Sequence, residues 1–214
     1  MIRSLVQLCA VAGVVVSLSG CSLLSTPDPV QNYRFGLPLD APSVEGETPA
    51  PLSVSIRRIE FPEASGDDRI LGVTGTETAY IGGARWVSPA STLFDDSLKA
   101  AFANRADQIR VLGRREPGTP PLVLQVTVTT FEARYAAPGA TPDVVITARA
   151  QLRSTPERRG EGAIRPEEGR SVERVFTVTQ AASENRVSAI VAAFDTATRD
   201  INTQIADWTI RSAR

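Results

Sequence analysis

Histidine is absent from this sequence of 214 residues, so the side chain best suited to proton transfer near neutral pH is missing. The absence excludes a Ser-His-Asp or Cys-His catalytic arrangement and any metal site with histidine ligands. Three adjacent acidic pairs, Asp67–Asp68, Asp95–Asp96 and Glu167–Glu168, are explained by solvation in loops and by the dipole of a helix N-terminus. We therefore predict that the protein is not an enzyme and uses no metal and no cofactor.

An excess of one charge is also missing. The 23 basic and 24 acidic residues nearly cancel, and the densest basic stretches are the pairs Arg57–Arg58, Arg114–Arg115 and Arg158–Arg159. Binding to nucleic acid normally requires a clustered basic face that neutralises phosphates. Nothing in the sequence indicates such a face, so we predict no nucleic-acid partner.

Long apolar runs and cysteines are scarce. Residues 4–18 form an apolar run, but it is shorter than the roughly 20 residues of a membrane-spanning helix. Preceded by Arg3 and followed by small residues, the run is typical of a secretory signal peptide. The only cysteines are Cys9 and Cys21, so cleavage before Cys21 and its acylation would leave no pair for an intramolecular disulfide.

The residues around the second cysteine resemble a bacterial lipobox. Leu18-Ser19-Gly20-Cys21 supplies an aliphatic residue, two small residues and the cysteine. The resemblance implies cleavage after Gly20 and lipidation of the Cys21 thiol, with acyl chains that include palmitate. The alternatives are an ordinary signal peptide with a chance cysteine, or an uncleaved anchor.

Lipidation would place the protein on a membrane without a transmembrane helix, because two or more acyl chains give a stable anchor. Residue 22 is Ser, not Asp, which by analogy with enteric lipoproteins favours the outer membrane. We predict a signal peptide at residues 1–20, a lipidated N-terminus and flexible tether at 21–32, and a folded domain at 33–214. The expected location is the cell envelope, facing the periplasm.

Strands are predicted where apolar and polar residues alternate. In residues 52–61 the apolar side chains change parity near Arg58, and in 122–135 they change parity near Thr129–Thr130, so we expect a β-bulge at both places. Further strands are predicted at 33–37, 70–81, 109–112, 144–152 and from 172 to 178.

Two amphipathic helices are predicted from apolar residues three or four positions apart. In the first, Ser88 suits the N-cap and Pro89 the first helical position, with an apolar stripe to about Arg105. The second runs from Val187 to Trp208. Together these patterns predict an α+β fold, a mainly antiparallel sheet with two amphipathic helices packed on one face.

Tyr80, Arg85 and Trp86 lie close together just before the first helix. Aromatic residues and arginine dominate the energetics of protein interfaces, so we interpret these three residues as a candidate partner-binding surface. The alternative is that Tyr80 and Trp86 pack under the start of the helix as the edge of the core.

The order of these features resembles the ABC-type transport auxiliary lipoprotein family, which pairs with MCE-domain lipid transport systems. Members carry a lipobox, a first strand with Tyr, a Trp-x-x-Pro-like step into a helix, and a final amphipathic helix after a strand hairpin. The corresponding features here are Cys21, Tyr33, Arg85-Trp86-Val87-Ser88-Pro89 and the 187–208 helix.

The resemblance implies a periplasm-facing lipoprotein subunit of an ABC/MCE-type envelope lipid transport system. It would act as a membrane tether and docking partner for the MCE-domain substrate-binding protein, itself coupled to an inner-membrane permease and ATPase. The alternative is an outer-membrane assembly or scaffold lipoprotein that regulates a β-barrel or an envelope synthase. A periplasmic hydrolase that uses carboxylates alone is a third class, and a homo-oligomer is left open.

Overall fold

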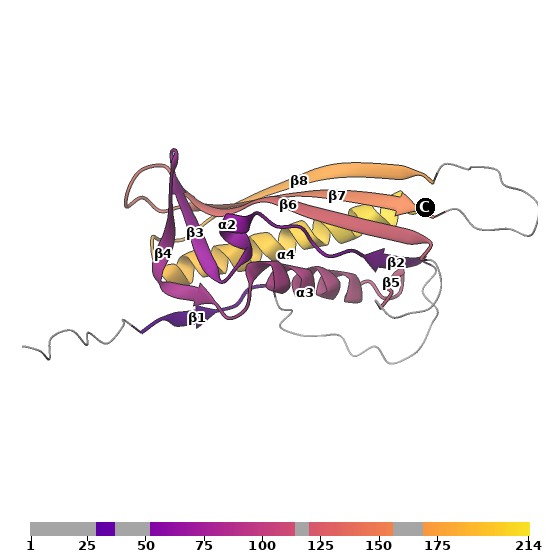
Figure 1. Cartoon of the computed structure of the whole chain (residues 1–214), viewed down its shortest axis with the longest axis horizontal. Helices are drawn as coiled ribbons and strands as arrows, with labels where there is room; N and C mark the ends of the chain where they lie inside the picture. Colours follow the sequence, from indigo (N-terminus) through magenta and orange to yellow (C-terminus); the bar gives the residue numbers. More distant parts are fainter. Residues whose placement is uncertain (1–28, 37–51, 114–119, 156–168) are drawn as a thin grey trace, which may run out of the picture. The chain divides into compact units, whose positions relative to one another are not determined.

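The computed structural model describes residues 29–36, 52–113, 120–155 and 169–214 (Figure 1). The predicted signal peptide, Cys21 and the tether up to residue 28 lie outside the described residues. All of the described helices and strands lie in one compact unit, Gln31–Arg214.

Three long strands form one side of the sheet, from β6 (Leu122–Tyr135) out to the edge strand β8 (Ser171–Ala181). Between them lies β7 (Asp143–Ser154), and each strand pairs antiparallel with the next. Because side chains alternate across a strand, Leu124 of β6 and Leu152 of β7 lie opposite each other in the core. The predicted α+β fold with a mostly antiparallel sheet is confirmed.

Both predicted bulges are present. The register between β6 and β7 shifts between Val128 and Thr130, where the apolar parity changes. Along the other edge of β6, the Arg57 N–H donates to the Leu124 carbonyl and the Glu60 N–H to the Val126 carbonyl. The three steps from Arg57 to Glu60 therefore run beside only two steps of β6, from Leu124 to Val126. The one extra residue shifts the alternation, so the apolar side chains that follow it face the core.

The remaining strands are short, and most of them pair in parallel. β2 (Leu52–Ile56) lies beside the start of β6, and β3 (Arg69–Thr74) lies beside its end. β5 (Ile109–Val111) pairs parallel with β2, while β4 (Glu77–Trp86) pairs antiparallel with β3. β1 (Gln31–Tyr33) pairs parallel with β4. This strand begins two residues before the predicted domain boundary at residue 33, so its first two residues lie within the predicted tether.

Helix α4 (Val187–Ser212) lies along β7 and β8, and α3 (Ala90–Ala103) packs beside it, as Figure 1 shows. Phe94 and Leu98 of α3 and Ile201 and Ile205 of α4 are fully buried, so the predicted apolar stripes face the core. The short helix α2 (Glu63–Gly66) lies between the predicted strands 52–61 and 70–81, where we predicted no helix.

The predicted start of the first helix is wrong by one residue. Pro89 is the N-cap residue, Ala90 is the first helical residue, and no side chain caps the helix. The Ala90 N–H instead donates to the carbonyl of Asp67, at a distance of 2.9 Å. A backbone group brought in by the α2–β3 connection therefore replaces the side-chain cap expected from Ser88.

Candidate functional site

Trp86 belongs to the core. Its side chain is 2% exposed, and its ring centroid lies 4.8 Å from that of Phe35 and 5.4 Å from that of Phe194. Alternation along β4 explains the placement, since Ala84 and Trp86 face inward while Arg85 faces solvent. The partner-binding role predicted for Trp86 is therefore corrected: in this structure its ring packs inside the domain.

Tyr80 and Arg85 remain on the surface. Tyr80 is 39% exposed, and the guanidinium carbon of Arg69 lies 3.8 Å from its ring centroid. Arg85 donates from Nη1 to Asp68 Oδ2 at 2.8 Å. We name Asp68, Arg69, Tyr80 and Arg85 the β3–β4 cluster; it presents an aromatic ring, two guanidinium groups and a carboxylate.

An irregular strand pairing brings these residues together. Arg69 pairs with Arg85, but Leu71 pairs with Tyr80, so two steps along β3 correspond to five along β4. The extra residues include Gly82 and Gly83, and Gly83 has a φ of 68°, which glycine adopts without steric cost. Arg69 therefore pairs with Arg85 across the ladder while its guanidinium lies over the ring of Tyr80.

Sequence reasoning missed half of this cluster. Arg69 was not identified, and Asp68 was explained by solvation, whereas its carboxylate accepts a hydrogen bond from Arg85. Seventeen positions separate Asp68 from Arg85, and their contact depends on the pairing of β3 with β4. No local spacing in the sequence signals it.

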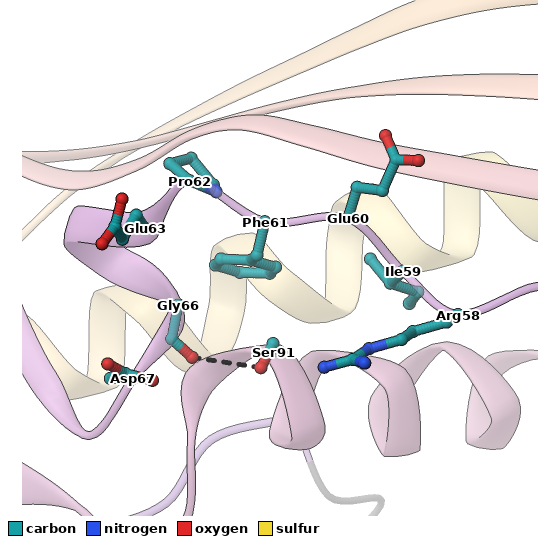
Figure 2. A pocket seen from close by; sticks show the side chains of 9 residues that line it. All are labelled: Arg58, Ile59, Glu60, Phe61, Pro62, Glu63, Gly66, Asp67 and Ser91. Atoms are coloured by element: carbon teal, nitrogen blue, oxygen red, sulfur yellow. Dashed lines mark hydrogen bonds between the residues drawn. The ribbon is translucent and has the colours of Figure 1, made fainter.

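A pocket of about 460 Å³ lies next to the cluster, between the segment 58–67 and the start of α3 (Figure 2). Figure 2 shows Arg58 on one side of Ser91, with Glu63 and Asp67 on the other. The Ser91 hydroxyl donates to the Gly66 carbonyl at 3.1 Å, which holds α2 against α3. Asp67, which lines the pocket, directly precedes Asp68 of the cluster in the chain, and the pocket lining carries both signs of charge.

The described residues contain no group of three or more His, Cys, Asp or Glu side chains that could hold a metal ion. Among the same residues, no helix has the length and apolar character needed to cross a membrane.

Comparison with known protein families shows which family this protein belongs to. The sequence matches the family described as the ABC-type transport auxiliary lipoprotein component over residues 33–206. The chain belongs to this family. The match runs from the end of β1 into α4, so it includes strands β2 to β8, helix α3, most of α4 and the β3–β4 cluster.

Solved structures agree on the fold of this auxiliary lipoprotein. Protein XCC0632 from Xanthomonas campestris, of the family DUF330, is 23% identical with a TM-score of 0.64, covering 85% of this chain and 96% of its own. An uncharacterized protein is 16% identical with a TM-score of 0.63, covering 84% of this chain and 98% of its own. No curated protein matched the sequence.

Family membership associates the protein with an ABC transport system and, as a lipoprotein, with the cell envelope.

Proposed function

We propose that the protein is the periplasm-facing lipoprotein subunit of an ABC/MCE-type envelope lipid transport system. In this role it is a membrane tether and a docking partner for the MCE-domain substrate-binding protein. The observation that carries the proposal is the family match over residues 33–206. The lipobox-like residues 18–21 and the exposed β3–β4 cluster support its two parts, the tether and the docking surface.

The tether part depends on Cys21. An acylated Cys21 holds the mature N-terminus in a membrane, and Ser22 favours the outer membrane. Replacing Cys21 with Ser should prevent labelling by palmitate and leave the protein uncleaved, at its full length. The control is Cys9→Ser, which lies in the predicted signal peptide and should leave labelling unchanged. A wild-type protein that stays full length and unlabelled would contradict the tether.

The docking part assigns Tyr80 and Arg85 to the contact with the partner. Both side chains are exposed, and aromatic and arginine side chains are the usual energetic centres of interfaces. The ion pair of Arg85 with Asp68 is also exposed, and such pairs add only about 0–1 kcal/mol to stability. A partner carboxylate can therefore replace Asp68 as the partner of Arg85 at little cost to the fold.

The docking test uses the full-length lipoprotein purified from its native membranes. Tyr80→Ala combined with Arg85→Ala should abolish co-purification of an MCE-domain protein, while circular dichroism and the midpoint of thermal unfolding stay close to wild type. The matched control is Arg211→Ala, an exposed arginine at the end of α4. Recovery of the partner with the double variant would remove the cluster from the contact. Recovery of a β-barrel or synthase with the wild-type protein, and no MCE-domain protein, would favour the alternative function.

A further inference from the structure

Strand β8 forms a long open edge of the sheet. Among the described strands, β1 and β5 end the sheet elsewhere with three residues each, whereas β8 has 11 residues and pairs only with β7. An edge of this length presents a row of backbone groups that another strand can pair with.

The hydrogen bonds at the two ends of β8 show which backbone groups face outward. The Ala182 N–H donates to the Pro142 carbonyl, and the Arg170 carbonyl accepts from the Ser154 N–H, both across the β7 side. Backbone groups alternate in direction along a strand, so the even-numbered residues of β8 bond to β7. The odd-numbered residues from Ser171 to Ala181 therefore direct their N–H and C=O groups away from β7, and all of these residues are exposed.

This edge lacks two of the features that commonly prevent strand addition, a proline and a β-bulge. It contains no proline, and its register with β7 continues without a bulge from Ser171 to Ala181. Val175, in the middle, is 54% exposed and is the most exposed of the large apolar side chains described. The neighbouring Glu173 and Arg174 cancel in charge.

We infer that β8 pairs with β8 of a second copy of this chain, antiparallel about a two-fold axis at Val175. Each Val175 then lies opposite its counterpart, and the two residues exchange backbone hydrogen bonds. Glu173 lies opposite Thr177 of the second copy, and Ser171 lies opposite Thr179. The pairing continues the sheet across both molecules and covers the exposed valine, and it does not depend on the proposed transport function.

Charge selects this register. With the axis at Val175, Arg174 lies opposite Phe176 of the second copy and Glu173 opposite Thr177, so no like charges face each other. Moving the axis to Arg174 would place two guanidinium groups directly opposite each other, which is destabilising. Moving it to Phe176 would place each Val175 opposite Thr177 of the second copy, so that the most exposed apolar side chain would have no apolar side chain directly opposite.

Cross-linking tests the inference in the full-length protein. Opposed residues that exchange hydrogen bonds have Cα atoms about 5.5 Å apart, within the range of roughly 4.4–6.8 Å that a disulfide spans. Val175→Cys should therefore give a disulfide-linked dimer in oxidised membranes that reverts to monomer on reduction. Ser171→Cys and Thr179→Cys should not link to themselves, but two tagged copies carrying one change each should link to one another. The native Cys9 and Cys21 are the same in every variant.

A second variant tests the pairing without a cross-link. Val175→Lys places two ammonium groups opposite each other and should weaken self-association about tenfold in native mass spectrometry or sedimentation. The matched control is Val87→Lys, because Val87 is 48% exposed and lies outside β8.

Three results would overturn the inference. The first is a Val175→Cys protein that stays monomeric while its thiol reacts freely with maleimide. The second is a Ser171→Cys protein that links to itself as readily as Val175→Cys does, and the third is a Val175→Cys protein that links to a different protein. Because none of these readouts involves Tyr80 or Arg85, failure here is distinguishable from failure of the docking proposal.

Discussion

The backbone N–H of Gly36 donates a hydrogen bond to Asp195 Oδ1 at 2.7 Å, across 159 positions of the chain. The donor follows β1 and the acceptor lies on α4, so the beginning of the domain is attached to its last helix. Phe35, the residue before, is 1% exposed and packs on Trp86 and Phe131. The segment that leaves β1 is therefore part of the core.

Gly36→Ala should destabilise the domain strongly. Gly36 has a φ of 74°, and a Cβ there would lie 2.6 Å from both Cβ and Oγ of Ser97. Left-handed backbone and overpacking together predict a loss of about 2–4 kcal/mol in the free energy of unfolding, measured by urea denaturation. The control is Gly139→Ala, where φ is 80° but no atom lies within 4 Å, so only about 1–2 kcal/mol should be lost. Equal losses in both variants would show that the contact with Ser97 relaxes freely.

Trp86→Ala and Tyr80→Ala should lower stability by very different amounts. Removing the buried Trp86 ring leaves a cavity among Phe35, Phe131 and Phe194 and should cost about 3–5 kcal/mol of stability. Removing Tyr80 loses an exposed contact with Arg69, worth about 0.5–1 kcal/mol. Thermal unfolding followed by circular dichroism compares the two, and a Trp86→Ala protein as stable as wild type would contradict the core position of Trp86.

Asn202→Leu should stabilise the domain. Asn202 is 0% exposed on α4, and neither Nδ2 nor Oδ1 has a hydrogen-bond partner among the residues that the structure describes. An unpaired buried amide costs about 1–3 kcal/mol, so an apolar side chain of similar size should raise the free energy of unfolding by a comparable amount. Thr203→Leu, at the exposed neighbouring position, should change it by no more than about 0.5 kcal/mol. A destabilised Asn202→Leu protein would show that the amide has a favourable partner in the adjacent cavity of about 110 Å³.

Tyr135 should make the domain less stable at alkaline pH. Desolvation by burial raises the pKa of its phenol above the ordinary value of 10.0. Above that pH the unfolded chain releases the proton while the folded protein keeps it, so the free energy of unfolding falls as pH rises. Below it the phenol is neutral in both states and contributes no pH dependence. Urea titrations across this range should show a smaller decline for Tyr135→Phe; identical declines would contradict the assignment.

Elements with strong local periodicity could be predicted from the sequence. The apolar stripe from Val187 to Trp208 lies within α4, and the change of parity near Thr129–Thr130 marks the bulge in β6. The orientation of Trp86 could also have been inferred, since a period of two places it on the face of β4 opposite to Arg85. Treating Arg85 and Trp86 as one surface overlooked that alternation.

The sequence by itself determined the fold class, the positions of the long strands and helices, and the candidate lipidation site at Cys21. These follow from patterns within a few consecutive residues, where side-chain direction is set by the helical or strand period. Only the tertiary structure decided the parallel pairing of β2 and β3 with β6, the contact of Arg69 with Tyr80, and the open edge of β8. Strand pairing joins backbone groups that are far apart in the chain, and because every residue type except proline carries the same N–H and C=O groups, side-chain identity alone does not specify the partner.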